Sequence, residues 1–127
     1  MTLVATIGLE DPLRDQIKES VKMIMDANTN VRLVSGDHKW SALTTAFTIG
    51  LVNFNDADEN AISGEELKTK LQLLMRKADD TEEGRGDTWE FRNPEAISEF
   101  KGEILQRVVV VYRADPDVKH MFTSAIR

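Results

Sequence analysis

Residues 33–37 read Leu33-Val34-Ser35-Gly36-Asp37, an apolar strand that runs into a hydroxyl, a glycine and a carboxylate. A helical pattern begins directly after them. This order is typical of a phosphate cradle, because the strand fixes the position, the glycine admits backbone amides and the hydroxyl donates to an oxyanion. The same order also describes an ordinary strand-to-helix turn, so the neighbouring segments decide between the two.

The composition bounds the class of protein. A chain of 127 residues fits one domain with a sizeable core, and 41% hydrophobic with 30% charged residues is ordinary for a globular protein. No apolar run approaches the length that crosses a bilayer, and the first residues lack a signal-peptide pattern. With no cysteine there is no disulfide and no thiolate metal site, which fits a reducing, cytosolic setting.

The acidic residues are concentrated in the middle of the chain. Residues 53–103 contain 14 acidic and 7 basic residues, whereas the remainder contains 8 and 9. The net charge of −6 argues against nucleic acid as a partner. We expect an acidic insertion at about 53–104 that forms a solvated surface segment.

Hydrophobic periodicity predicts alternating strands and helices. Strands are expected over residues 3–9, 31–34 and 108–112, the last fully buried because its β-branched run is unbroken. Helices are expected from residue 12 to a stop at 28–30, and over 38–51, 63–75, 94–105 and 117–126. Residues 53–60 are expected to form a polar connection, and 79–93 a loop.

Several helix starts and buried faces follow from the sequence. Asp11 and Asp115 each precede a proline and are placed to cap a helix, and Ser63 opens a capping box with Glu66. The apolar face of the first helix should pack against a sheet and consists of Leu13, Ile17, Val21 and Ile24. The inner side of the second should consist of Leu43, Ala46, Phe47 and Gly50.

This order of elements indicates an α/β fold with a mainly parallel sheet, in which ligands gather beyond the carboxyl ends of the strands. Three strand ends should therefore meet at one edge and deliver Asp11 and Arg14, then Ser35, Gly36 and Asp37, then Arg113 and Lys119. Such a set suits a phosphate or a nucleotide. The alternative is that the aspartates are only caps, while Arg14 and Arg113 pair with acidic neighbours.

Five segments, in this order, resemble the P-type cation-transporting ATPases. They are Gly8-Leu9-Glu10-Asp11-Pro12-Leu13-Arg14, similar to G-x-E-D-P-x-R; residues 31–37, similar to V-x-M-V-T-G-D; 42–51, similar to T-A-x-x-I-A-x-x-x-G-I; 62–67, similar to a G-x-E-F helix start; and 109–120, similar to strand-A-R-x-x-P-x-x-K-H. The closest likeness is to the calcium pumps, particularly the plasma-membrane type.

The resemblance implies a haloacid-dehalogenase-like phosphorylation domain with a Rossmann-type, mainly parallel sheet flanked by helices, here incomplete. It implies that Ser35, Gly36 and Lys119 coordinate the phosphoryl group. It further implies that Asp11, Arg14, Asp37 and Arg113 line the nucleotide side. For the parent protein it implies ATP and Mg²⁺, with no cofactor required by this chain alone.

The chain also departs from the family pattern. Ser35 stands where the family has threonine, which keeps the hydroxyl, and His38 stands where asparagine is usual. The nucleophile segment D-K-T-G-T and the later magnesium-binding segment T-G-D-G-x-N-D do not occur. Asp115-Pro116-Asp117 resembles a D-x-D nucleophile motif. It lies beyond its strand, however, and the fifth position of the motif is Lys119 rather than threonine or valine. His38 and His120 do not have the spacing of a metal pair, so no metal ligand is expected.

We therefore expect residues 1–127 to be a partial phosphorylation domain of a calcium-transporting P-type ATPase, inactive alone. Its partners would be the nucleotide-binding, actuator and membrane domains of the parent, and the isolated piece could associate with itself through an unpaired strand edge. It would be a cytosolic domain of an integral membrane protein and soluble as a fragment. Two alternatives stay open, namely a soluble phosphatase of the same superfamily and a non-catalytic interaction module.

Overall fold

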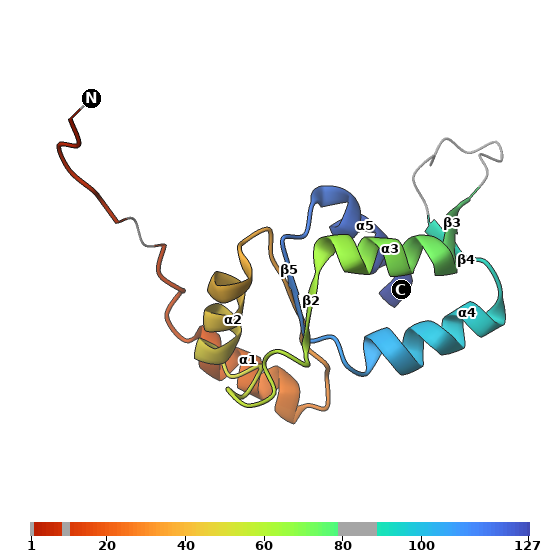
Figure 1. Cartoon of the computed structure of the whole chain (residues 1–127). Helices are drawn as coiled ribbons and strands as arrows, with labels where there is room; N and C mark the ends of the chain where they lie inside the picture. Colours follow the sequence, from red (N-terminus) through yellow and green to blue (C-terminus); the bar gives the residue numbers. More distant parts are fainter. Residues whose placement is uncertain (1, 9–10, 79–88) are drawn as a thin grey trace.

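The computed structural model describes residues 2–8, 11–78 and 89–127. Its elements are α1 (Ile17–Asp26), β1 (Leu33–Val34), α2 (Lys39–Thr48), β2 (Ala61–Ser63), α3 (Gly64–Leu74), β3 (Met75–Lys77), β4 (Trp89–Phe91), α4 (Pro94–Glu99), the π-helix η1 (Phe100–Leu105), β5 (Val110–Tyr112) and α5 (Pro116–Ile126) (Figure 1). The structure is thus mixed α/β.

A parallel three-stranded sheet organises the fold, in the order β1-β5-β2. In its central strand β5, Val110 and Val111 are both fully buried. Successive side chains of a strand point to opposite faces, so both faces of the sheet are covered at this strand. Val110 packs in one hydrophobic cluster with residues of α2, and Val111 in a larger one with residues of α3, η1 and α5. Helices therefore cover both faces, which confirms the expected α/β class with a parallel sheet.

The strand predicted over residues 3–9 is wrong for the described part of that segment. Residues 2–8 form no strand, and Leu3, Val4 and Ile7 are at least 80% exposed. A strand is stabilised by its partner's hydrogen bonds, and no other strand of the described chain pairs with this segment. In Figure 1 the segment runs out from the body of the fold toward the N-terminus.

The first helix also differs from the prediction. It begins at Ile17 rather than Pro12, and its N-cap is Gln16 in the left-handed region (φ 66°), so Asp11 is not its cap. Of the predicted apolar face only Val21 is buried. Residues 2–8 form no strand, so they provide no sheet surface against which the apolar face of α1 could pack.

The strand β2 was missed, although the helix start beside it was predicted. Ala61–Ser63 pairs in parallel with β5 over three residues. Such a short run has no periodicity to distinguish it from the polar connection before it. The predicted cap of α3 is confirmed, since the Ser63 hydroxyl accepts a hydrogen bond from the Glu66 amide at 3.1 Å.

The described part of the acidic region contributes to the core, so the prediction of a solvated surface segment is wrong there. Leu67, Leu71, Phe100 and Ile104 lie in the larger core cluster, with exposures of 2% or less. Residues 89–91, predicted within a loop, form β4 and pair antiparallel with β3. The rest of the predicted loop, residues 79–88, lies outside the described residues.

The remaining helices follow the sequence closely. Residues 94–105 are helical as predicted, with a π-helical second half, and α5 begins after its predicted cap, Asp115. In α2, Leu43 and Ala46 are buried as predicted, but Phe47 is 55% exposed, and Gly50 lies beyond the end of the helix and is exposed. No helix in the described ranges has the length and apolar character needed to span a membrane.

Candidate functional site: the carboxyl edge of the sheet

The carboxyl ends of β1 and β5 lie side by side. The Ser35 amide donates to the Val111 carbonyl at 2.9 Å, and the Ala114 amide donates back to the Ser35 carbonyl at 2.9 Å. The Arg113 amide donates to the Asp37 carbonyl, also at 2.9 Å. The pairing thus continues beyond both strands and places residues 35–37 against residues 113–114.

A third strand end completes this edge, and it belongs to β2. Gly64 follows β2, and a Cβ on it would lie 2.4 Å from the Arg113 carbonyl oxygen and 2.8 Å from the Ala114 Cα. Real Cβ atoms do not approach that closely, so only glycine fits where the two turns meet. We name residues 35–37, 63–65 and 113–115 the carboxyl edge.

The Ser35 hydroxyl is held by the turn that it starts. It donates to Asp37 Oδ2 at 2.9 Å and accepts from the Asp37 amide at 3.1 Å. The hydroxyl would donate to a bound oxyanion only after rotating away from the Asp37 carboxylate. That carboxylate is exposed, so solvent and cations can screen its charge.

Position 36 has room for a Cβ. A Cβ there would lie 3.6 Å from the Ala114 carbonyl oxygen, an ordinary contact. The contacts within this chain therefore do not require glycine at position 36, in contrast to position 64. The Gly36 amide has no hydrogen-bond partner among the described residues, so it is available to an acceptor.

Arg113 has an unusual backbone at the centre of the edge. Its φ of 51° is left-handed, which costs a residue with a side chain about 1–2 kcal/mol. Its exposed guanidinium forms no ion pair with another described residue. The alternative in which Arg113 pairs with an acidic neighbour is therefore not what the structure shows.

The start of α5 adds a cap and a cation. Asp115 Oδ1 accepts from the Val118 amide at 2.7 Å, and this bond is the main reason that the pKa of Asp115 is lowered. Lys119 follows one turn later, and its amide donates to the Asp115 carbonyl at 3.1 Å. The exposed Lys119 ammonium has no partner in the described part of the chain.

The structure does not bring Asp11 and Arg14 to the carboxyl edge by the predicted route. Their placement depended on a strand over residues 3–9, which does not form in the described part of that segment. Both residues are exposed, and neither side chain has a hydrogen bond or an ion pair with a described residue. The edge is built from β1, β5 and β2 instead.

Lys68 is a residue of this region that sequence reasoning missed. It reaches from α3 to the start of α5, with Nζ 3.2 Å from Asp115 Oδ2 and 3.4 Å from Asp117 Oδ2. The hydrogen bond that Lys68 donates to the Asp115 carboxylate is the first cause that raises the pKa of Lys68. Little in the sequence indicates this contact, because Lys68 is 47 positions from Asp115 and 49 from Asp117.

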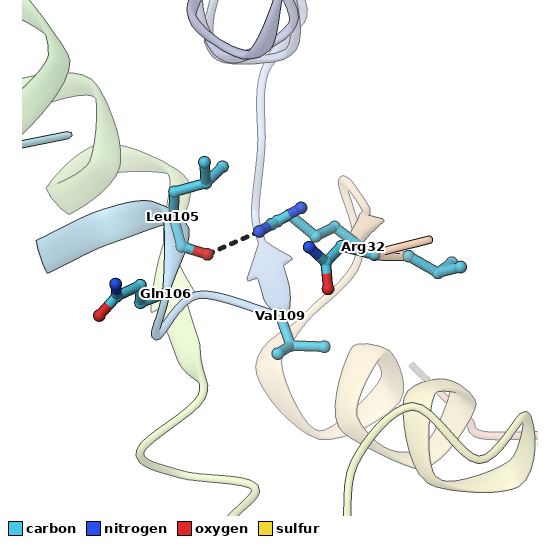
Figure 2. Close-up of a pocket in the computed structure, with 6 residues that line it drawn as sticks. Arg32, Leu105, Gln106 and Val109 are labelled. Atoms are coloured by element: carbon cyan, nitrogen blue, oxygen red, sulfur yellow. Dashed lines mark hydrogen bonds between the residues drawn. The ribbon is translucent and has the colours of Figure 1, made fainter. Parts of the chain in front are cut away.

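A cavity of about 350 Å³ lies at the opposite, amino end of β1 and β5 and contains Arg32 (Figure 2). Arg32 donates from Nη2 to the Leu105 carbonyl at 2.6 Å and from Nε to the Val108 carbonyl at 3.2 Å. Burial lowers its pKa. Through these two bonds the guanidinium ties the end of η1 and the chain before β5 to the segment before β1.

The described residues contain no group of three or more His, Cys, Asp or Glu side chains that could hold a metal ion. By themselves these residues therefore offer no such ligand set for Mg²⁺.

No protein-family model matches the chain. Curated relatives do match: it is 37% identical over 75 residues to the probable calcium-transporting ATPase 8, plasma membrane-type, of Oryza sativa subsp. japonica, and 32% over 59 residues to calcium-transporting ATPase 12, plasma membrane-type, of Arabidopsis thaliana. It is 25% identical over 126 residues to the plasma membrane calcium-transporting ATPase 1 of Gallus gallus.

These matches relate the chain to the P-type calcium-transporting ATPases. The three relatives are named as plasma-membrane pumps. The matches cover 59%, 46% and 99% of this chain but only 7%, 6% and 9% of the respective relatives. The chain therefore spans only a small part of the length of the relatives that it matches.

Proposed function

We propose that this chain is a partial phosphorylation domain, with a haloacid-dehalogenase-like fold, of a calcium-transporting P-type ATPase. The parent reaction is ATP hydrolysis through an aspartyl-phosphate, coupled to cation transport. In this proposal the carboxyl edge receives the phosphoryl group, while the nucleophile and the Mg²⁺ ligands belong to other parts of the parent. The chain is inactive alone and works as a cytosolic domain of a membrane protein.

One observation carries the proposal, namely that residues 35–37 and 113–114 are hydrogen-bonded neighbours at the carboxyl edge. They come from two segments that lie far apart in the sequence and that both resemble the pump motifs. The free Gly36 amide and the Lys119 ammonium are a donor and a cation of the kind that stabilises phosphoryl oxygens. The calcium-pump relatives support the same assignment.

The proposed roles differ among the residues. Ser35, Gly36 and Lys119 are the phosphoryl-coordinating set, and Asp37 with Arg113 stands on the nucleotide side. Asp11 and Arg14 stay in the proposal only through their likeness to the E-D-P-x-R segment, because their placement would need a strand partner from the rest of the parent. The nucleotide-binding, actuator and membrane domains of that parent are the proposed partners.

Inorganic phosphate tests the proposal on the ¹⁵N-labelled 127-residue chain. We expect saturable shifts, at millimolar phosphate, of the amides of Ser35, Gly36 and Lys119. Ser35→Ala and Lys119→Ala should each weaken this binding, because each removes a group that contacts the anion. Orthovanadate should perturb the same amides.

Matched controls separate binding from general electrostatics. Ser98→Ala removes a hydroxyl that donates to the Pro94 carbonyl on α4, and Lys101→Ala removes an exposed cation on η1. Neither should change the phosphate affinity. Shifts that spread over all cations, without saturation at the carboxyl edge, would overturn the proposal.

A further inference from the structure

The first turns of α3 and α5 meet across the carboxyl edge. Gly64, the first residue of α3, lies in backbone contact with Arg113 and Ala114, which lead into α5. The two helices also pack along their lengths, with Leu67, Leu71, Val118 and Met121 in one cluster. The position of α5 is therefore set against α3.

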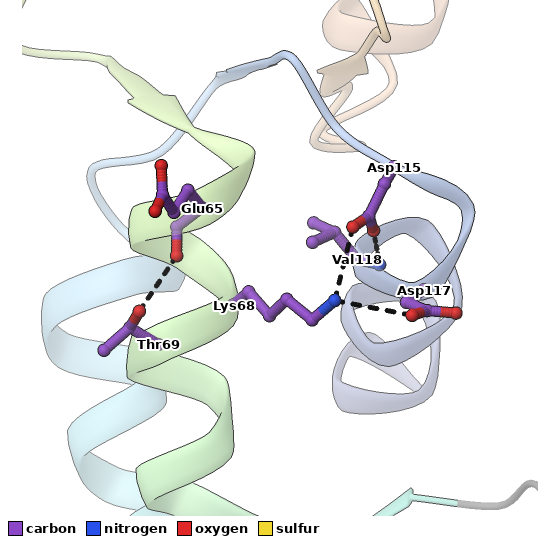
Figure 3. A network of polar contacts seen from close by, with 6 residues as sticks. All are labelled: Glu65, Lys68, Thr69, Asp115, Asp117 and Val118. Atoms are coloured by element: carbon purple, nitrogen blue, oxygen red, sulfur yellow. Dashed lines mark hydrogen bonds and ion pairs between the residues drawn. The ribbon is translucent and has the colours of Figure 1, made fainter.

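Lys68 links these two helix starts through side chains (Figure 3). Asp115 divides its oxygens between two tasks, since Oδ1 caps α5 through the Val118 amide and Oδ2 accepts from Lys68 Nζ. Asp117, two residues further along the chain, accepts a hydrogen bond from the same ammonium. The Lys68 side chain is 31% exposed, against 50% and 78% for its two partners, so the ammonium reaches outward from a partly buried stem.

We propose that Lys68 is a positioning residue, which fixes the first turn of α5 on α3 and so sets where Lys119 stands at the carboxyl edge. The role of Lys68 in phosphate binding rests on the proposed function, whereas the contact between α3 and α5 does not depend on it. The connection to Lys119 is short, because the Asp115 carbonyl accepts the Lys119 amide in the first helical bond. A shift of Asp115 therefore moves Lys119 with it.

Removing Lys68 should loosen the link without unfolding α5. The cap from Asp115 to Val118 remains, and Asp115 with Asp117 still lies at the positive end of the helix dipole. What is lost is the side-chain tie between the two helices. The effect should thus appear in the orientation of α5 and in anion binding more than in helix content.

The test compares Lys68→Met and Lys68→Arg with Lys70→Met. Lys70 is the matched control, because it lies on the same helix and its one ion pair with a described residue is with Glu66 of α3, at 3.4 Å. Residual dipolar couplings of the free chain measure the orientation of α5 relative to α3. We expect a change for Lys68→Met, restoration in Lys68→Arg and no change for Lys70→Met.

Phosphate titration gives the second readout. Lys68→Met should weaken phosphate binding at the Lys119 amide about threefold, the scale of a partly exposed ion pair, with the thermal midpoint little changed. Unchanged couplings and unchanged affinity in Lys68→Met would overturn the positioning role. If the unmodified chain binds no phosphate but the couplings still change, the positioning stands and the proposed function fails.

Discussion

Gly64 is the residue at which the β2–α3 and β5–α5 turns touch. A Cβ added to Gly64 would lie 2.4 Å from the Arg113 carbonyl oxygen, so there is no room for a side chain. The atoms that would be struck belong to backbone, so they cannot turn aside as the end of a side chain can. The residue therefore determines how closely β2 and β5 bring their following helices together.

Gly64→Ala should lower the free energy of unfolding by about 1–3 kcal/mol, the usual cost of overpacking. Urea unfolding measures the change. Gly102→Ala is the control, because a Cβ at that helical glycine meets nothing within 4 Å. It should leave stability unchanged or raise it by up to about 1 kcal/mol through helix propensity. Equal behaviour of the two variants would contradict the close contact.

Asp115 gives the carboxyl edge a pH dependence. Its pKa in the folded chain lies below the ordinary aspartate value of about 3.9, first because of the Val118 amide and then because of Lys68. A lowered pKa stabilises the fold above the ordinary value, and the stabilisation is lost as the pH falls through the lowered one. The loss should therefore lie below a pH of about 4.

Asp115→Asn tests this dependence, because asparagine caps nearly as well as aspartate but does not titrate. The unfolding free energy of the unmodified chain should exceed that of the variant more at about pH 5 than at about pH 3. Asp26→Asn, which removes an exposed carboxylate of α1, is the control for the loss of one charge. A stability difference that is the same at both pH values would contradict the assignment.

At the residue scale the sequence predicted what local chemistry determines. The caps at Ser63 and Asp115 and the adjacency of the Ser35 and Arg113 segments follow from spacing and strand order. The left-handed Arg113, the Gly64 contact and the Lys68 bridge did not follow. Each of these depends on where two segments meet in three dimensions, which local pattern does not contain.

The elements were predicted where a long pattern supported them. The helices α3 and α5 and the central strand β5 were found, whereas β2 was missed and residues 3–9 were wrongly given a strand. Both errors concern strand pairing. A three-residue segment is a strand only because it forms hydrogen bonds with a neighbouring strand, and an apolar segment without such a neighbour forms no strand. The prediction for the acidic region was wrong because it was based on net charge, which does not reveal the buried leucines of α3.

Leu67→Ala should show that α3 is part of the core. Leu67 is fully buried, and removing its side chain should cost about 2–5 kcal/mol of unfolding free energy. Leu73 lies on the same helix but is 72% exposed, so Leu73→Ala should change stability by less than about 0.5 kcal/mol. Urea unfolding separates the two cases, and a small cost at Leu67 would favour the surface interpretation.

At the scale of the whole molecule, the described chain has an apolar segment without a strand partner. The sheet has three strands, and in the described part of the chain an apolar segment at residues 2–8 is exposed and unpaired. The matches with the relatives cover only 7%, 6% and 9% of the relatives' own length. We propose that the parent pump supplies the missing strand partner, and that the isolated chain uses the same surface for self-association.

Sequencing the complete reading frame that contains these 127 residues tests this account most directly. If the chain is part of the proposed phosphorylation domain, the frame contains a D-K-T-G-T segment upstream, a T-G-D-G-x-N-D segment downstream and hydrophobic spans long enough to cross a bilayer on both sides. A reading frame with none of these three features would contradict the assignment to a calcium-transporting P-type ATPase and would leave the carboxyl edge without a phosphoryl group to receive.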